Sequence, residues 1–549
     1  MSDSAEQLFE ELQQQYYSAW FRFNPERAVE VGVDDHAGEL RSYADDDIGA
    51  LIALNRKLIT ALDEMSIEHL SETSRADFRI LRAAADIELH ELEERDWRYR
   101  NPMEYVPVSA VYQLLIYPVD EVHQAVKRRT QKIPEYLRGA KMQLSQHPER
   151  VVLLWLQSAV SECRVGADFI RNLARHPMIT QKFSNPARLQ PLFEEAAHAL
   201  EDFARFLETE IAPKAKGDFA CGEHHLNRLL NEKHFMETSA DAVLSFGKAL
   251  YKSTQDALLA QTSAMRGDEN VEELLRSIQR QHPDAGHLLE SYRQRMKTSY
   301  DWWAKSGVVT VPKKHSLKVL ATPEFLRHMI PFAAYEPPQT GDPEQHGYYY
   351  VTTTSDEDAL AEHNNYSIDL TSAHEAFPGH HLQFVTENQR EISYTRLLNA
   401  SATMYEGWAL YSEELAIEQG YLDKDEHRFI MLRDLAWRAL RIIVDVELQT
   451  GKLGIDAAVD LLVSELGLSH EQAQAEINWY SFSPGTPLCY AIGREMILQA
   501  RAVCQEKGGF KLKKFHDQLL SEGSIALPLI IQLSMGNTVW QSVKEKMFA

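Results

Sequence analysis

Apolar side chains recur at helical spacing over most of the chain. Residues 5–25 and 50–65 have the pattern of amphipathic helices, and similar stretches continue through roughly 110–300. In the first segment every fourth residue is large and apolar: Leu8, Leu12, Tyr16 and Trp20. Residues four apart share one face of an α-helix, so these side chains can be buried together. The pattern therefore predicts a mainly α-helical protein.

Capping signals mark two of the predicted helix starts. Thr322 supplies a capping hydroxyl and Pro323 suits the first helical position, whereas Pro331 would end that helix. Ser469 and Gln472 have the spacing of a capping box, in which each side chain bonds the backbone N–H of the other. We therefore expect helices to begin after Thr322 and after Ser469.

Three runs that precede residue 374 have strand character instead. Residues 308–311, 317–320 and 348–353 are rich in β-branched or aromatic side chains, which favour extended backbone. They predict a small β-sheet next to the helix that begins before residue 374. A hairpin that merely covers the core would show the same pattern.

No linker divides the chain into separate domains. Its 549 residues would suffice for several domains of about 150 residues, but no Gly/Ser-rich tract, low-complexity segment or internal repeat interrupts it. We expect one large helical body over residues 1–549 with a central cleft. Two lobes are the alternative, one of about 1–300 and one of about 301–549, with the strands and the candidate site in the second.

Composition and charge exclude several functions. A formal net charge of −24 disfavours binding of nucleic acid through a basic face. The longest apolar stretch, 525–533, is too short to span a membrane and contains Pro528. The first residues lack a basic region followed by an apolar run, and four scattered cysteines suit a reducing compartment. These features predict a cytoplasmic protein without a membrane segment, and they indicate no particular oligomeric state.

The segment from His374 to His381 carries the most specific chemistry. It reads His-Glu-Ala-Phe-Pro-Gly-His-His, which is the zinc-peptidase pattern H-E-x-x-H with Pro378 and Gly379 inserted before the second histidine. In the uninterrupted pattern, two histidines on one helix face bind zinc and the glutamate activates a water. Because proline breaks or kinks a helix, we expect the helix to end near Phe377.

Two histidines compete for the role of second ligand. His380 inherits the motif position if the Pro-Gly pair loops out. On an unbroken helix His381 would return to the face of His374, because successive residues turn by about 100°, but it would lie about 10 Å further along the axis. We predict His374 and His380 as ligands and keep His381 as the alternative. In a simpler interpretation, Glu375 only caps the start of a helix, as the second member of a capping box with Ser372.

A third ligand is expected on a separate helix downstream. Apolar residues repeat there at helical spacing: Trp408, Tyr411 and Leu415. Glu406 stands in this segment beside Gly407, whose missing side chain would let another group approach closely. Most glutamates are exposed, but two histidines and one glutamate, with the fourth position open to water, form a catalytic zinc site. Glu406 is the predicted third ligand, and Glu413 is the alternative.

These motifs resemble one bacterial family. The chain is similar over nearly its whole length to the family known as domain of unknown function 885, whose mostly helical members resemble the gluzincin metallopeptidases. The resemblance rests on His374, Glu375, Pro378, Gly379, His380, His381 and Gln383, on Glu406-Gly407-Trp408-Ala409, and on residues 484–493. It implies a gluzincin-like fold with one zinc ion bound by His374, His380 and Glu406. It also implies Glu375 as the general base and Tyr490 as a donor to the oxyanion.

Three positions depart from the pattern associated with this family. Gln449 stands where a histidine is expected, Trp479 where an arginine is common, and Thr486 where a glutamine is usual. If these residues shape the substrate pocket, they alter specificity rather than metal binding.

The predicted ligands indicate a hydrolase. Zinc lowers the pKa of its bound water from about 16 towards about 7, and Glu375 would pass the proton of that water to the leaving amine. We expect a zinc peptidase that cleaves oligopeptides or small amides, of the carboxypeptidase or oligopeptidase type. Arg438 or Arg441 could hold a substrate carboxylate, and Arg494 could replace Tyr490 as oxyanion donor.

Two other functions fit the same residues. One is a non-catalytic helical protein that retains the fold. The other is a metal-dependent amide or ester hydrolase whose substrate is not a peptide. Metal analysis combined with profiling of peptide digests separates these possibilities.

Overall fold

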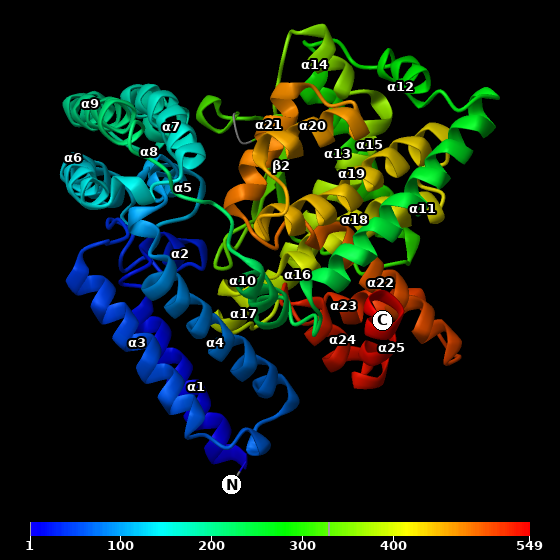
Figure 1. The fold of residues 1–549 in the computed structure, drawn as a ribbon, viewed down its shortest axis with the longest axis horizontal. Helices are drawn as coiled ribbons and strands as arrows, with labels where there is room; N and C mark the ends of the chain where they lie inside the picture. Colours follow the sequence, from blue (N-terminus) through cyan, green and yellow to red (C-terminus); the bar gives the residue numbers. More distant parts are fainter. Residues whose placement is uncertain (1, 328–329) are drawn as a thin grey trace. The chain divides into compact units, whose positions relative to one another are not determined.

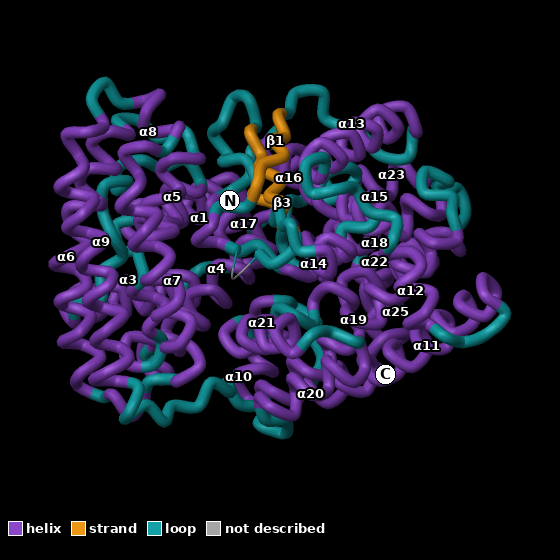
Figure 2. The backbone as a smooth tube through the Cα atoms, turned by 90° about the horizontal axis from the view of Figure 1, so that it is seen from above, coloured by secondary structure: helices purple, strands orange, loops and turns teal. Residues whose placement is uncertain are grey.

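The computed structural model describes residues 2–327 and 330–549. Helices dominate these residues, and the strands among them form one small three-stranded sheet (Figures 1 and 2). The prediction of a mainly α-helical fold with a small β-sheet is confirmed. None of the described helices combines the length and the apolar character that crossing a membrane requires.

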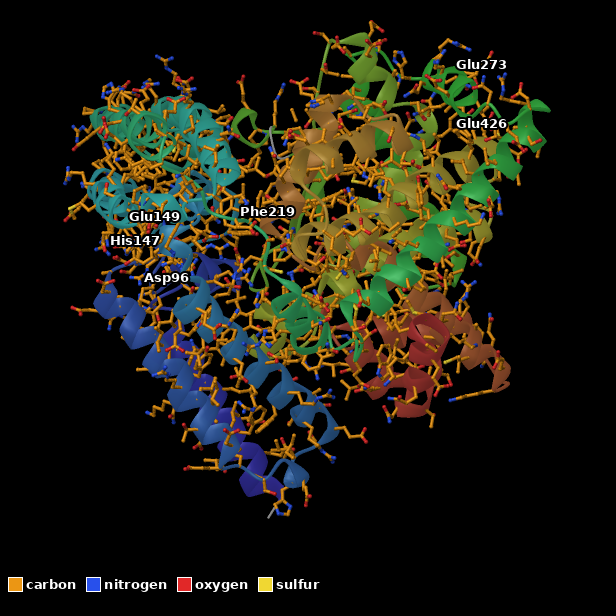
Figure 3. The ribbon with its side chains drawn as sticks, viewed as in Figure 1. Asp96, His147, Glu149, Phe219, Glu273 and Glu426 are labelled. Carbon is orange, nitrogen blue, oxygen red and sulfur yellow. The ribbon has the colours of Figure 1, made fainter. Side chains whose placement is uncertain are left out.

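The chain forms two compact units. Unit 1 consists of Met1–Phe219 with Gln339–Pro343, and unit 2 consists of Ala220–Pro338 with Glu344–Ala549. The division therefore falls after Phe219, which is labelled in Figure 3, whereas the two-lobe alternative placed it near residue 300. Unit 2 contains all of the candidate site residues.

Unit 1 is a helical bundle. Its α-helices are α1 (Ser2–Trp20), α2 (Pro25–Glu30), α3 (Asp45–Asp63), α4 (Glu72–His90), α5 (Val108–Ile116), α6 (Val122–Gln146), α7 (Leu153–Asn172), α8 (Pro177–Lys182) and α9 (Gln190–Phe206). Helix α9 packs against both α6 and α7, and α3 packs against α4. The amide of Gln339 donates to the carbonyl of Val29 (2.5 Å) and ties the short segment Gln339–Pro343 to α2.

Unit 2 holds the longest helices and the sheet. Its α-helices are α10 (Glu223–Arg228), α11 (Ala240–Arg266), α12 (Val271–Gln279), α13 (Leu288–Ser306), α14 (Glu357–Glu362), α15 (Asn365–Glu375), α16 (His380–Asn388), α17 (Tyr394–Leu398), α18 (Ala402–Glu418), α19 (Asp425–Gln449), α20 (Ile455–Leu466), α21 (His470–Phe482), α22 (Cys489–Glu506), α23 (Leu512–Leu519), α24 (Leu527–Met535) and α25 (Asn537–Phe548). Helix α19 packs against α11, α15 and α22, while α18 packs against α15 and α22.

Two glycines let α18 and α22 approach closely. A Cβ atom on Gly407 would lie 2.6 Å from the Cα of Gly493, and one on Gly493 would lie 2.1 Å from the carbonyl oxygen of Thr403. Real side chains are not accommodated at such distances, so this crossing requires glycine on both helices. The crossing fixes the position of α18 along its axis and its rotation at Glu406, the residue before Gly407.

The sheet has the strand order β1-β3-β2. Strand β1 (Ser316–Ala321) runs parallel to β3 (His346–Val351), and β2 (Ala333–Glu336) runs antiparallel to β3, so that β2 is an edge strand. Val319 and Tyr349 lie opposite one another in the β1–β3 pair. Both belong to a buried cluster with Ile368 of α15, which places the sheet against the helix that carries His374.

Strand prediction succeeded for two runs and failed for one. Residues 317–320 lie in β1 and the first part of 348–353 lies in β3. Residues 308–311 form no strand, because their backbone groups bond to α23: His516 pairs with the carbonyl of Val308 (2.8 Å), and Asp517 accepts from the N–H of Thr310 (2.8 Å). Strand β2 was not predicted.

Of the two helix starts predicted from capping signals, one is confirmed and one is only a single turn. Helix α21 begins directly after Ser469, and the capping box with Gln472 is formed in both directions. After Thr322 the chain makes only a 3-10 turn over Glu324–Leu326, so the predicted helix is a single turn.

Candidate metal centre

The helix that carries His374 breaks where the inserted Pro-Gly pair predicted. Helix α15 ends at Glu375 and α16 begins at His380. The turn between them is tight: the N–H of Gly379 donates to the carbonyl of Ala373 (2.9 Å), and a Cβ on Gly379 would lie 1.8 Å from the carbonyl oxygen of His374. Glycine is therefore required at position 379.

Two other helices hold this turn in place. The Ser299 hydroxyl on α13 donates to the carbonyl of Phe377 (2.5 Å). The indole N–H of Trp408 on α18 donates to the carbonyl of Pro378 (2.8 Å). Buried carbonyls need a donor, and these two bonds tie the turn to α13 and α18.

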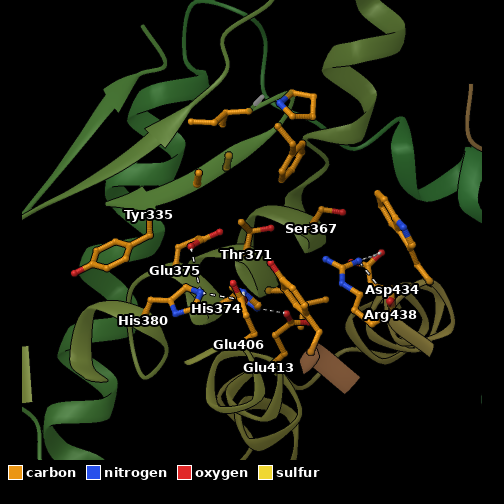
Figure 4. Close-up of a pocket in the computed structure, with 18 of the residues that line it drawn as sticks. Tyr335, Ser367, Thr371, His374, Glu375, His380, Glu406, Glu413, Asp434 and Arg438 are labelled. Atoms are coloured by element: carbon orange, nitrogen blue, oxygen red, sulfur yellow. Dashed lines mark hydrogen bonds and ion pairs between the residues drawn. The ribbon is translucent and has the colours of Figure 1, made fainter. Parts of the chain in front are cut away.

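The turn brings two imidazoles and one carboxylate together. Nε2 of His380 lies 3.4 Å from Oε2 of Glu406, and Nε2 of His374 lies 3.6 Å from the same oxygen. One ligand atom from each of His374, Glu375 and His380 also lies within 4.8 Å of the others. Figure 4 shows these side chains converging from α15, α16 and α18.

The convergence fits a small divalent cation. Zinc bonds of about 2.0–2.2 Å in a tetrahedron put neighbouring ligand atoms about 3.4 Å apart, close to the two distances to Glu406. Oε2 of Glu406 is buried and has no hydrogen-bond partner among the described residues. A buried carboxylate oxygen is costly without a partner, and a cation between the three groups would supply one.

Glu413 lies on the other side of the His374 ring. Nδ1 of His374 donates to Oε1 of Glu413 (2.7 Å), and the glutamate side chain is 5% exposed. A carboxylate on the remote nitrogen fixes the tautomer and orientation of a metal-binding histidine. Glu413 is therefore placed to orient His374, whereas Glu406 lies at the nitrogen that points to the candidate site.

His381 points away from these groups. Its Nδ1 hydrogen-bonds with the hydroxyl of Tyr335 on β2 (2.9 Å), and its Nε2 lies 3.3 Å from Nδ1 of His315. Burial holds the pKa of His381 well below its ordinary value, so the ring is neutral. Of the two alternatives, His380 is the histidine that the structure brings to His374 and Glu406.

Burial and mutual contact shift the protonation of these groups. Burial raises the pKa of Glu375, although the imidazoles of His374 and His380 oppose the shift. Burial alone would lower the pKa of His374, but Glu406 and Glu413 raise it to about 10. Burial likewise favours a neutral Glu406, yet His380 and His374 hold its pKa well below the usual range. The carboxylates around His374 thus favour a positive charge in this cluster.

A pocket of about 520 Å³ opens on these residues. Its wall includes Tyr490, whose hydroxyl lies beside Glu406; burial and the neighbouring carboxylate raise the pKa of that phenol. Arg494, the alternative oxyanion donor, does not line the pocket and pairs with Glu414 (2.6 Å). Strand β2 contributes Ala333, Ala334 and Tyr335 to the lining of the pocket.

Two of the three departures from the family pattern lie outside the pocket. Gln449 is buried between a backbone N–H of Cys221 (3.0 Å) and the carbonyl of Tyr480 (2.9 Å), where it joins segments of the fold. Thr486 also lies outside the pocket-lining residues. Trp479 lines the pocket, so it is the departure that can affect a bound substrate.

Sequence reasoning named only two residues of one pocket wall, Arg438 and Arg441, and missed their neighbours. Helix α19 lines it with residues on a single face: Arg433, Asp434, Trp437, Arg438 and Arg441. Their spacing of i, i+1, i+4, i+5 and i+8 is that of one helical stripe. Charged and aromatic residues on one stripe, separated by apolar residues, were the signal available in the sequence.

A family model described as "Bacterial protein of unknown function (DUF885)" matches residues 25–533. The protein belongs to this family. Among curated proteins, none matches this DUF885 chain.

Two solved structures share its fold over nearly the whole length. "A putative lipoprotein of unknown function" from Shewanella oneidensis is 20% identical with a TM-score of 0.77, covering 96% of this chain and 99% of its own. "The putative lipoprotein" from Colwellia psychrerythraea is 16% identical with a TM-score of 0.79, covering 99% of both chains. Metallocarboxypeptidase 1 of Trypanosoma cruzi is 12% identical with a TM-score of 0.44, covering 98% of this chain and 99% of its own. At that TM-score the last likeness supports no conclusion.

The prediction of a cytoplasmic location is contradicted by the first two structures, because both are described as lipoproteins rather than as cytoplasmic proteins. That prediction rested on scattered cysteines and on the first few residues of the sequence. Neither feature measures where the folded protein resides.

Proposed function

We propose that this DUF885 protein is a zinc-dependent hydrolase that cleaves amide bonds in short peptides. The observation that carries the proposal is the approach of His374 and His380 to one oxygen of Glu406, at 3.6 and 3.4 Å, in the wall of a pocket. Two histidines and a glutamate are a donor set of catalytic zinc sites, which keep one position open.

The residues around the candidate metal have distinct roles in this proposal. Zinc, when bound, supplies Lewis acidity and a nucleophilic water near neutral pH. Glu375 accepts a proton from the attacking water and delivers it to the leaving nitrogen, a role that its raised pKa favours. The hydroxyl of Tyr490 donates to the oxyanion that develops on the substrate. Glu413 holds His374 in the orientation that faces the site.

The pocket favours small substrates. A volume of about 520 Å³ lies in the range of cavities that hold small-molecule ligands, about 300–1,000 Å³. Short peptides and small amides fit such a space, whereas a folded protein does not enter it. Because β2 is an edge strand that lines the pocket, its backbone is also available to pair with an extended peptide.

Metal analysis and peptide profiling test the proposal together. Purified wild-type protein should contain one equivalent of zinc, and His374→Ala should lose it. Glu375→Gln should retain zinc but lose hydrolysis of a broad peptide library followed by mass spectrometry. Zinc without any cleavage by the wild type would instead support a non-peptide substrate or a non-catalytic protein, and absence of zinc from the wild type would refute the proposed site.

A further inference from the structure

One wall of the pocket is rich in guanidinium groups. Arg433, Arg438 and Arg441 all line it from α19. In Figure 4, Arg438 and Asp434 lie across the pocket from Tyr335 and His380. A substrate held at the candidate metal centre therefore faces the wall that carries Arg438.

Arg441 already has its partners. Its Nε donates to the hydroxyl of Tyr480 (2.9 Å) and its Nη2 to Glu476 (2.9 Å). Its guanidinium also lies 4.8 Å from the centre of the Tyr490 ring. These contacts make Arg441 a support for the pocket wall rather than a group that waits for a ligand.

Arg433 and Arg438 share a single carboxylate at long range. Their Nη1 atoms lie 3.6 and 3.9 Å from Oδ1 of Asp434, beyond the usual limit of about 3.2 Å for a hydrogen bond. The side chains are only 17% and 18% exposed. Nε of Arg438 is buried and has no hydrogen-bond partner among the described residues. Nη1 of Arg438 also donates to the backbone carbonyl of Asp434, at 3.4 Å. Two largely buried cations thus face one loosely held carboxylate.

A second carboxylate would complete this arrangement. Guanidinium groups bind carboxylates in a planar, two-pronged contact, and a buried guanidinium is costly without such a partner. The ring of Trp437 lies 5.0 Å from the Arg438 guanidinium and favours its position by a cation–π contact. The site therefore selects for a planar anion.

We propose that Arg438, with Arg433 beside it, binds the carboxylate of a substrate whose amide bond lies at the candidate metal centre. The inference rests on the proposed hydrolase function for the reaction, but the carboxylate site can be measured without it. It specifies substrates with a free carboxylate close to the scissile bond, and hence cleavage near the C-terminus of a peptide.

Three matched peptides test this inference. The first has a free C-terminal carboxylate, the second is its C-terminal amide, and the third is an amide whose last residue is glutamate. Wild-type protein should cleave the first with a kcat/KM at least tenfold above that of the second, since hydrogen bonds to charged groups contribute about 10- to 100-fold. If the third peptide is cleaved as efficiently as the first, the carboxylate that Arg438 binds belongs to a substrate side chain.

Arg438→Gln should lower kcat/KM about 10- to 100-fold for the carboxylate peptide and leave the neutral amide unchanged. Arg438→Lys keeps the charge but lacks the two-pronged geometry of a guanidinium. Its kcat/KM for the carboxylate peptide should therefore lie between those of the wild type and Arg438→Gln. This variant replaces Arg438→Gln in the test if the glutamine variant does not fold. Arg428→Gln is the matched control, because Arg428 is an exposed residue of the same helix outside the pocket. Equal losses on the acid and the amide in Arg438→Gln would overturn the inference.

Calorimetric binding to the metal-free protein separates this inference from the proposed function. The carboxylate peptide should bind more tightly than its amide to the wild type and not to Arg438→Gln, whether or not any peptide is hydrolysed. Equal binding of acid and amide by the wild type would refute the carboxylate site, even in an active zinc hydrolase.

Discussion

The indole N–H of Trp408 donates to the carbonyl of Pro378 at 2.8 Å. This bond joins the two sequence motifs, since Pro378 lies in the turn between His374 and His380 while Trp408 lies two residues after Glu406 on α18. The residue that follows the glutamate in the motif also has a structural reason: Gly407 allows α22 to pack closely. The motif Glu-Gly-Trp thus contains one candidate ligand and two residues that fix its position.

Replacing Trp408 with Phe should loosen the turn and weaken metal binding. The variant leaves the buried Pro378 carbonyl without its donor, a loss of about 1–3 kcal/mol in the free energy of unfolding. Urea denaturation measures that loss, and competition with a chelator measures zinc affinity. Trp540→Phe is the control, because Trp540 is also fully buried but lies in α25. An equal drop in zinc affinity in both variants would refute a specific role for the Trp408–Pro378 bond.

Replacing Glu413 with Gln should weaken zinc binding while leaving the fold intact. The carboxylate accepts the Nδ1 proton of His374 at 2.7 Å, and loss of such a partner lowers metal affinity about 10- to 100-fold. Chelator competition on the purified variant checks this. Glu414→Gln is the neighbouring control, since Glu414 lies on the same helix as Glu413, pairs with Arg494 of α22 and does not line the pocket. Unchanged affinity in Glu413→Gln would count against an orienting role.

The break in the motif helix could be predicted because its causes are local. Proline cannot continue the helix, and the Pro-Gly pair has a conformational preference of its own. The choice between Glu406 and Glu413 could not be made in the same way. These residues stand seven positions apart on one face of α18, so helical spacing ranks them equally. Only the tertiary position of His374 decides, because its ring lies between them and turns Nε2 to Glu406 and Nδ1 to Glu413.

The sheet shows the same limit. Strand β2 has the sequence Ala-Ala-Tyr-Glu, which favours extended backbone only weakly, and it is held by pairing with β3. Residues 308–311 have stronger strand propensity but bond to α23. In both cases the partner, and not the segment itself, determines the backbone.

Substituting Gly407 with Ala should destabilise the second unit. The added Cβ would lie 2.6 Å from the Cα of Gly493, which is backbone and cannot turn aside. Forcing α18 and α22 apart should lower the unfolding free energy by about 1–3 kcal/mol, despite the higher helix propensity of alanine. Urea denaturation measures the change. Gly286→Ala should alter it by less than about 0.5 kcal/mol, because the added Cβ would meet only Oδ1 of Asp284, at an ordinary contact distance of 3.5 Å. Similar losses in both variants would contradict the close crossing.

Glu162 should make the stability of the first unit depend on pH. This α7 residue is 4% exposed, and burial raises its pKa from 4.5 to about 8. The folded state therefore binds the proton more tightly than the unfolded state does. Its contribution to stability is fully present below about pH 4.5 and is lost as the pH rises through about 8, with a slope of at most about 1.4 kcal/mol per pH unit.

Glu162→Gln isolates this contribution, because glutamine does not titrate. Urea denaturation between pH 5 and pH 8 should show the variant gaining stability relative to the wild type as the pH rises. The reason is that folding of the wild type at higher pH requires Glu162 either to bind a proton or to be buried as a charged carboxylate. Glu195→Gln on α9 is the control, as Glu195 is exposed, and its difference from the wild type should stay constant. A constant difference for Glu162→Gln as well would mean that Glu162 has the same pKa in the folded and unfolded states.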